Sequence, residues 1–313
     1  MKDRRLPESV VVSPDAQLPY SKGLMAKTLM STGLPPHRAY ALARQIEQEL
    51  AEQGKDSATT EGLFELAARV MAEREGPEAV ARLRRVQALA ELDLPLVVLI
   101  GGATGTGKSS VATEVAHRLG ITRLTSTDFV RQTMRAFFSR EFMPSIHYSS
   151  FEAAAAVTVP EQEARDPILL GFLEQTRNVL VGVKAVVDRA LEEGYSMVLE
   201  GVHLVPGLLP LHFEGAVVVQ CVLAISNEQE HAAHFSTRDA ASAGLRPVEK
   251  YLGALGDIRV IQEHVVERAR KSGSPVIENT RLDSAIDGVI ELVLREVESV
   301  SSLREETLGA KGR

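Results

Sequence analysis

The sequence predicts an α/β fold, a parallel β-sheet flanked by helices, preceded by a small, mostly α-helical N-terminal domain. From residue 96 onward, short apolar runs of strand length alternate with longer segments whose apolar residues recur at helical spacing, which is typical of a parallel sheet. Before residue 94 helical spacing dominates, and Pro and Gly mark the segment ends. At 313 residues the chain is long enough for two domains. We therefore expect domains at residues 1–93 and 94–313.

The N-terminal domain is expected to contain one short strand and several helices. Three valines at residues 10–12 predict the strand, which runs into a turn at Ser13-Pro14-Asp15. Residues 54–60 are predicted to form a linker. Helices are predicted after Ser21, after Pro36, and over residues 63–73 and 78–92.

Five strands are predicted in the C-terminal domain, and helical segments separate them. The unbroken apolar run at 96–100 is typical of a fully buried parallel strand. Ligands of such sheets bind at the carboxyl ends of the strands, so the residues that follow each strand are candidates for a functional site. The predicted strands cover residues 96–100, 123–126, 196–200, 216–224 and 275–277, with a long helix over 168–193 and a fraying tail over 299–313.

The first of these strands is followed by a complete phosphate-binding motif, G-x-x-x-x-G-K-[ST], which predicts a domain of the P-loop NTPase type. Glycines let backbone amides approach a phosphate, and the helix that begins near Lys108 adds the positive end of its dipole. Lys108 is expected to reach the β- and γ-phosphates of ATP, and the Ser109 hydroxyl to bind Mg²⁺. A glycine turn that binds nothing is the alternative, which the Lys-Ser pair disfavours. The residues expected to bind the nucleotide are Gly102, Ala103, Thr104, Gly105, Thr106, Gly107, Lys108, Ser109 and Ser110.

The second strand is followed by an acid and two arginines. Asp128 is expected to orient or deprotonate an acceptor hydroxyl, although Asp is also favoured as a helix N-cap. Arg131 and Arg135 lie four residues apart, hence on one helix face. They are predicted to bind an anionic acceptor, and a solvated basic face is the alternative.

The later strand ends supply further candidates. Glu200 ends the third strand and is expected to support Mg²⁺ together with Ser109, with an exposed strand-end acid as the alternative. His203 either touches substrate or hydrogen-bonds its own loop. Asn279 follows the last strand and is expected to pack near the adenine.

A helical hairpin with basic residues follows the fourth strand and is predicted to be a lid over ATP. Arg238 is expected to stabilise charge in the transition state, while Arg246 and Lys250 are candidates for acceptor binding. His231 and His234 have a spacing seen in metal sites, but because no third ligand lies nearby we do not expect a metal there.

Composition indicates a cytoplasmic protein. Hydrophobic residues make up 44% and charged residues 25%, as in ordinary globular proteins, and the net charge of −7 argues against a nucleic-acid partner. The first residues lack the apolar run of a signal peptide, and no run is long enough for a membrane span. The lone cysteine, Cys221, lies in an apolar run and is expected to fill the core.

Taken together, these motifs resemble the 2-phosphoglycerate kinase family. The segments that resemble it are GGATGTGKSS, STDFVRQTMR, HYSSFEA, LEGVHLVPG, RPVEKYL and VIEN. The resemblance implies an ATP- and Mg²⁺-dependent kinase that converts 2-phosphoglycerate to 2,3-bisphosphoglycerate. It also implies that Ser149 and Ser150 bind the acceptor. The charges of such an acceptor match the cations that Arg131, Arg135, Arg238, Arg246 and Lys250 supply.

The first 90 or so residues resemble an ATP-cone, a small regulatory nucleotide-binding module. ATP-cones usually have basic residues in the first hairpin, where this chain has Ser13-Pro14-Asp15. This departure argues against nucleotide binding by the domain, which is then expected to serve in packing or assembly, including homo-oligomer formation.

Two other functions remain open from the residues alone. The same fold can phosphorylate another anionic alcohol, such as an inositol phosphate, because arginines bind phosphates on many scaffolds. A regulator that binds nucleotide without transferring phosphate is the alternative from another class. A nucleic-acid enzyme is disfavoured, since the sequence has no stripe of aromatic and basic residues.

Overall fold

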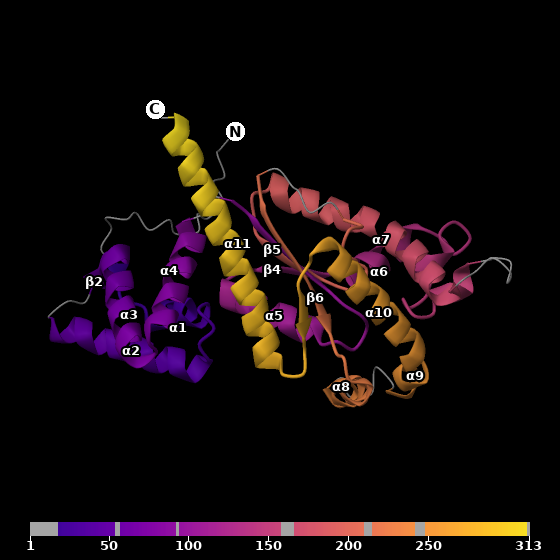
Figure 1. The fold of residues 1–313 in the computed structure, drawn as a ribbon, viewed down its shortest axis with the longest axis horizontal. Helices are drawn as coiled ribbons and strands as arrows, with labels where there is room; N and C mark the ends of the chain where they lie inside the picture. The colour runs from indigo at the N-terminus through magenta and orange to yellow at the C-terminus, as the bar shows by residue number, and fades with distance from the viewer. Residues whose placement is uncertain are drawn as a thin grey trace. The chain divides into compact units, whose positions relative to one another are not determined.

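The chain divides into two compact units, Met1–Leu92 and Asp93–Arg313 (Figure 1). The computed structural model describes residues 18–53, 57–91, 94–157, 166–209, 215–241 and 248–311. The strand predicted at 10–12, the Ser13-Pro14-Asp15 turn and Arg246 lie outside these residues, as do residues 54–56 of the predicted linker at 54–60. The rest of that linker is not irregular as expected, since Ser57–Ala58 form a short strand and a helix begins at Thr60.

The described part of the N-terminal unit is mostly helical, as predicted. Ser21 caps the first helix by accepting a hydrogen bond from the amide of Leu24, and Thr59 caps the third in the same way. The apolar residues that recur along the second helix are all buried, and they form one core with residues of the other three helices. The elements are β1 (Leu18–Pro19), α1 (Lys22–Met30), α2 (Pro36–Glu52), β2 (Ser57–Ala58, antiparallel to β1), α3 (Thr60–Arg74) and α4 (Pro77–Glu91).

A parallel sheet forms the centre of the C-terminal unit, and its strand order is β4-β5-β3-β6-β7. All six residues of the middle strand are buried, which explains its uninterrupted apolar sequence. Cys221 lies in the strand Val217–Ala224, beside the middle strand, and is fully buried, as expected. The strands are β3 (Leu96–Gly101), β4 (Arg123–Ser126), β5 (Met197–Glu200), β6 (Val217–Ala224) and β7 (Val276–Glu278).

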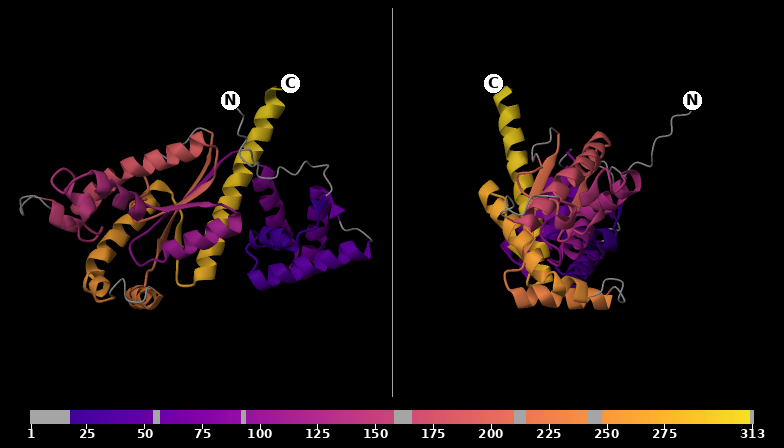
Figure 2. Two further views of the ribbon diagram at one scale, coloured as in Figure 1. Left: turned by 180° about the vertical axis from the view of Figure 1, so that it is seen from behind. Right: turned by 90° about the vertical axis from the view of Figure 1, so that its right-hand side faces the viewer.

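Helices cover both faces of this sheet (Figures 1 and 2). One face packs against α5 (Lys108–Leu119) and α11 (Leu282–Lys311). The other packs against α6 (Thr127–Phe137), α7 (Pro167–Glu192) and α10 (Leu255–Ser272). The hairpin of α8 (Glu228–Ala241) and α9 (Val248–Gly253) follows β6.

The last helix differs from the sequence prediction. A fraying tail is expected over residues 299–313, but α11 continues through Lys311. No Pro or Gly interrupts residues 289–308, so the helix that packs on the sheet has no stop signal there.

Register places the candidate residues at one edge of the sheet. Glu200, the last residue of β5, pairs with Ile100 on β3 and with Ser126 on β4. The P-loop therefore begins beside Glu200 on one side, and the segment containing Asp128 begins on the other. Among the described helices, none combines the length and the apolarity that crossing a membrane requires.

Candidate active site

The P-loop between β3 and α5 has a shape that only glycine permits at three positions. Gly102, Gly105 and Gly107 have φ angles of 137°, 88° and 79°. A Cβ atom on Gly105 would lie 2.5 Å from the Phe235 ring, and one on Gly107 would lie 2.4 Å from Nδ2 of Asn279. The backbone conformation and the surrounding side chains therefore both require a loop without side chains at these glycines. A phosphate can approach the backbone amides of such a loop closely.

Three side chains from distant parts of the chain hold the P-loop carbonyls. His231 Nε2 donates to the carbonyl of Thr104 over 2.8 Å, and His234 Nδ1 donates to that of Gly105 over 3.2 Å. Asn279 Nδ2 donates to the Thr106 carbonyl over 2.8 Å. Sequence reasoning missed this role for the two histidines, because their spacing indicated only a lid helix or a metal pair. The structure assigns them to loop support.

Lys108, Ser109 and Glu200 converge at the mouth of the loop. The Lys108 ammonium donates to the Ala103 carbonyl over 2.5 Å, and burial lowers the pKa of this lysine against the opposing effect of Glu200 and Asp128. The Ser109 hydroxyl donates to Oε1 of Glu200 over 2.8 Å. A hydroxyl and a carboxylate beside a phosphate loop are oxygen donors of the kind Mg²⁺ prefers.

These two oxygens fit a magnesium ion that phosphate and water oxygens complete. Within the described residues, no cluster of three or more His, Cys, Asp or Glu side chains forms a protein-only metal site. Mg²⁺ in phosphoryl-transfer sites characteristically keeps few protein ligands, so the donor set agrees with such an ion.

A cavity of about 450 Å³ joins the P-loop to the ends of β4 and β5. The apolar part of its wall consists of Phe151, Val202, Tyr251 and Leu282. It is also lined by Ser126, Gly201, His234 and Thr280. The predicted residues that line it are Thr104, Gly105, Gly107, Lys108, Ser109, Ser110, Asp128, Arg131, Ser149, Ser150, Glu200 and Asn279.

Asp128 and Arg131 form an ion pair in the wall of this cavity. Arg131 Nε lies 3.1 Å from Oδ1 of Asp128, and its Nη1 donates to the carbonyls of Ile146 and Tyr148, each over 2.9 Å. The arginine side chain is 8% exposed and that of the aspartate 67%. Desolvation in the cavity raises the pKa of Asp128, but its electrostatic interactions with His203, with the Arg131 guanidinium and with the Lys108 ammonium outweigh this effect and lower the pKa below its usual value.

The structure does not bring every predicted acceptor residue to the cavity. Arg135 is exposed and donates to Oε1 of Gln132 over 2.9 Å, and it is absent from the cavity lining. Lys250 lies 2.9 Å from a carboxylate oxygen of Glu152 and 5.7 Å from the centre of the Phe151 ring. Arg238 belongs to α8, but its side chain is outside the described part of the chain, as is all of Arg246.

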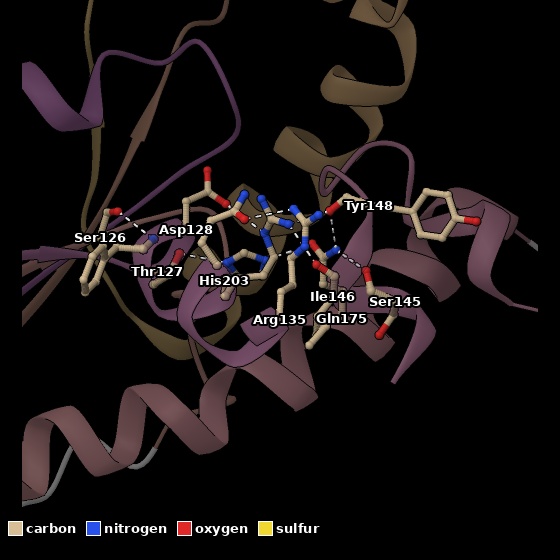
Figure 3. A network of polar contacts seen from close by, with 12 residues as sticks. Ser126, Thr127, Asp128, Arg135, Ser145, Ile146, Tyr148, Gln175 and His203 are labelled. Carbon is tan, nitrogen blue, oxygen red and sulfur yellow. Dashed lines mark hydrogen bonds and ion pairs between the residues drawn. The ribbon is translucent and has the colours of Figure 1, made fainter. Parts of the chain in front are cut away.

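His203, predicted among the substrate-binding residues, is instead fully buried and does not line the cavity. Its Nδ1 lies 2.8 Å from the Thr127 hydroxyl, and its Nε2 lies 2.9 Å from Oε1 of Gln175 (Figure 3). Burial lowers the pKa of His203 to about 4, with Asp128 opposing this shift and Arg131 and Lys108 adding to it. The histidine is therefore neutral at physiological pH. No sequence signal marks Gln175, because it lies among polar neighbours on α7, between Glu174 and Thr176.

Two known proteins are similar to this chain over most of its length. It is 39% identical over 274 residues to the 2-phosphoglycerate kinase of Methanothermobacter thermautotrophicus, covering 87% of this chain and 89% of that protein. It is 37% identical over 284 residues to the 2-phosphoglycerate kinase of Thermococcus kodakarensis, covering 91% and 96%. The chain belongs to the 2-phosphoglycerate kinase family. No family model matches it.

Solved structures similar to this member of the 2-phosphoglycerate kinase family include a gluconokinase and a shikimate kinase. A gluconokinase from Sinorhizobium meliloti 1021 is 14% identical with a TM-score of 0.38, covering 68% of this chain and 99% of that chain. A shikimate kinase from Acinetobacter baumannii in complex with shikimate is 16% identical with a TM-score of 0.35, covering 68% and 97%. Neither likeness assigns a role to a residue of this chain.

Membership of the 2-phosphoglycerate kinase family confirms the resemblance that the motifs indicated. It favours an enzyme over a nucleotide-sensing regulator, and it disfavours an inositol phosphate as the acceptor.

Proposed function

We propose that this protein transfers the γ-phosphoryl group of ATP to the free hydroxyl of 2-phosphoglycerate, giving 2,3-bisphosphoglycerate and ADP. One observation supports this most directly. This member of the 2-phosphoglycerate kinase family has one cavity that both the phosphate loop and an Asp–Arg pair line. The loop suits the phosphates of the donor, and the pair suits a hydroxyl next to anionic groups.

The nucleotide side is formed by the P-loop. Its amides cradle the phosphates, and Lys108 exchanges the Ala103 carbonyl for the β- and γ-phosphates. Ser109 and Glu200 would hold Mg²⁺, which when bound neutralises charge on those phosphates. Asn279 supports the P-loop in addition to any contact with the adenine, because its side-chain amide donates to the Thr106 carbonyl.

The acceptor side is formed by Asp128, Arg131, Ser149 and Ser150. The guanidinium of Arg131 is fixed by two carbonyls and one carboxylate, so it presents a preorganised positive charge to the acceptor. The serine hydroxyls add hydrogen-bond donors.

Asp128 orients the acceptor hydroxyl and is a weak base. A carboxylate with a lowered pKa accepts a hydrogen bond well but takes a proton poorly. The acceptor oxygen attacks the γ-phosphorus as the bond to the bridging oxygen of ADP breaks, and ADP leaves with that electron pair. The hydroxyl proton passes to solvent, directly or through Asp128, late in a loose transition state.

The α8–α9 hairpin acts as a lid in this proposal. His234 of α8 and Tyr251 of α9 line the cavity, so the hairpin borders the nucleotide site. Closure would bring Arg238 and Arg246 toward the transferred phosphoryl group and release Lys250 from Glu152, with Arg135 at the outer edge of the acceptor site.

Residues 1–93 are proposed to form an ATP-cone-like domain that serves in assembly, including a homo-oligomer, rather than in nucleotide binding. Calorimetric titration of the full chain with ATP tests this. One nucleotide per chain that disappears in Lys108→Ala supports it, and binding that survives in Lys108→Ala places a second nucleotide site in the N-terminal domain.

The catalytic proposal is tested with ATP, Mg²⁺ and a panel of phosphorylated hydroxy acids and polyols, with products identified by mass spectrometry. Lys108→Ala is the control. A bisphosphorylated product from 2-phosphoglycerate that is absent with the control supports the proposal. Product from another acceptor alone, or ATP binding without product, overturns it.

A further inference from the structure

Behind the acceptor side of the cavity, buried side chains form one continuous series of hydrogen bonds (Figure 3). Thr127 Oγ1 lies 2.8 Å from His203 Nδ1, and His203 Nε2 lies 2.9 Å from Gln175 Oε1. Gln175 Nε2 then donates to the carbonyl of Ser145 over 2.6 Å and to that of Tyr148 over 3.1 Å. Thr127, His203 and Gln175 are all 0% exposed. Bulk water therefore does not reach these three side chains.

The chemistry of the groups fixes the direction of every bond in the series. A carbonyl can only accept, so Gln175 uses both amide hydrogens on Ser145 and Tyr148 and must accept at its oxygen. His203 must then donate from Nε2. Because burial lowers the pKa of His203 and keeps the ring neutral, Nδ1 accepts from the Thr127 hydroxyl and the ring is the Nε2–H tautomer.

The series connects the two parts of the acceptor side that come from different segments. At one end, Thr127 precedes Asp128 in the first turn of α6. At the other end, the Tyr148 carbonyl accepts from both Gln175 and Arg131, immediately before Ser149 and Ser150. Fixing Thr127 and the Tyr148 carbonyl therefore fixes the separation of the carboxylate from the serine turn.

The surroundings leave little freedom for this arrangement. Gly201 has a φ of 155°, and a Cβ atom there would lie 1.8 Å from Oγ1 of Thr127. Gly171 on α7, four residues before Gln175, also has no room for a side chain, since a Cβ atom there would lie 2.3 Å from the backbone nitrogen of Ala154. The chain is therefore closely packed beside Thr127 and in the turn of α7 that precedes Gln175.

We propose that His203 and Gln175 are positioning residues that hold Asp128 and the Ser149–Ser150 turn at the separation the acceptor requires. This rests on the proposed function, because it concerns the acceptor of that reaction. The lowered pKa of His203 agrees with it, since the neutral ring is the form that the series needs. Neither residue lines the cavity, so neither is a catalytic residue.

Steady-state kinetics of matched variants test the proposal. Gln175→Leu and the isosteric Gln175→Glu both remove the two donors to the carbonyls, and the second variant keeps the test valid if the first fails to fold. Loss of such a buried network is expected to raise the KM for the acceptor about tenfold or more, while the KM for ATP stays within about twofold. Equal effects on both KM values, or no effect on the acceptor KM, overturn the proposal.

The neighbouring Thr176 provides a control on the same helix. Its side chain is buried, and its hydroxyl has no hydrogen-bond partner in the described part of the chain. Thr176→Val therefore changes a buried polar atom next to the series without entering it, and it is expected to leave both KM values unchanged. A raised acceptor KM in this variant would mean that α7 responds to any perturbation, and would overturn the specific role of Gln175.

His203 is tested by rescue. His203→Gln keeps a side-chain donor toward Gln175 and is expected to restore most of the acceptor affinity that His203→Leu loses. Equal acceptor KM values for these two variants contradict the proposal.

Nitrogen-15 NMR of histidine-labelled wild-type protein separates this proposal from the proposed function. The His203 ring, assigned by its loss in His203→Gln, is expected as the Nε2–H tautomer at pH 7. An Nδ1–H or protonated ring overturns the inference even where the enzyme is active. If the ring is as expected but no tested acceptor is phosphorylated, the proposed function fails and the hydrogen-bond series stands.

Discussion

In the proposed reaction Asp128 has two tasks, and its ionised form suits both. It pairs with Arg131 in the structure, and it would accept a hydrogen bond from the incoming hydroxyl. Its lowered pKa makes the ionised form stable and proton removal unfavourable. The structure thus favours positioning over base catalysis for this residue.

Asp128→Asn is therefore predicted to lower kcat by about 10- to 100-fold, because the amide still accepts a hydrogen bond but lacks the charge. Asp188→Asn is the matched control, since Asp188 is an exposed acid paired with Lys184 on α7, remote in sequence from the P-loop. Steady-state kinetics measure both. A loss of four or more orders of magnitude in kcat for Asp128→Asn would instead identify a general base.

The lowered pKa of His203 predicts that the free energy of unfolding falls in acid. Its folded pKa of about 4 lies below the ordinary value of 6.5, so below pH 6.5 the unfolded chain binds more protons at this residue than the folded one. The stabilisation is complete above pH 6.5 and is lost as the pH falls toward 4. The expected loss in the free energy of unfolding is about 3 kcal/mol.

Chemical denaturation of wild-type and His203→Gln protein between pH 4 and 7 measures this loss. The variant has no titrating group at this position, so its free energy of unfolding should fall less steeply with acidification. Parallel curves for the two proteins would refute the assignment of His203 as a buried neutral ring.

Single residues could be predicted from the sequence where their partners are close in sequence. The P-loop is a local motif, and its glycines and Lys108 indicate their chemistry directly. The partners of Arg131 are carbonyls 15 and 17 residues away, and His203 and Gln175 are 28 residues apart. Such long-range contacts leave no spacing signal, so the supporting role of His203 was not predictable.

At the level of elements, the P-loop and α8 must fit closely. Gly105 has little space around it, because a Cβ atom there would lie 2.5 Å from Phe235 and 2.9 Å from Nε2 of His231. Both residues lie in the N-terminal part of α8, so this part of the helix and the loop determine each other's position.

Gly105→Ala is predicted to weaken ATP binding at least about 100-fold, because backbone strain and the clash with α8 both distort the loop. Gly273→Ala is the control, since Gly273 also has a positive φ, 71°, but a Cβ atom there would have no neighbouring atom within 4 Å. This control should lose about 1 kcal/mol of stability and keep its ATP affinity. Calorimetric titration checks both, and unchanged affinity in Gly105→Ala would refute the tight fit.

The strands and most helices were predictable because their patterns are strong over short windows. The five apolar runs became the five described strands of the sheet, shifted by a residue or less at most ends. The helix predicted over residues 168–193 agrees with α7 within one residue at each end. The extent of α11 was not predictable, since polar residues after 298 weakened the apolar pattern while nothing stopped the helix.

For the whole molecule, strand order decides where the chemistry occurs. The order β4-β5-β3-β6-β7 could not be derived from the sequence, because it depends on pairings between residues as far apart as Leu96 and Val217. The rule that ligands bind at the carboxyl edge nevertheless predicted the location of the candidate site, since it holds for any order of parallel strands. Phosphate loop, Glu200 and Asp128 meet there because β3, β5 and β4 are neighbours.

The central claim is that this cavity joins ATP to 2-phosphoglycerate, and phosphorus-31 NMR of one reaction tests it most directly. With ATP, Mg²⁺ and 2-phosphoglycerate, the wild-type protein should produce a second phosphomonoester signal on the acceptor together with an equal amount of ADP, and Lys108→Ala should produce neither. ADP formed with only inorganic phosphate, or no change in the acceptor signal at any enzyme concentration, would contradict the claim.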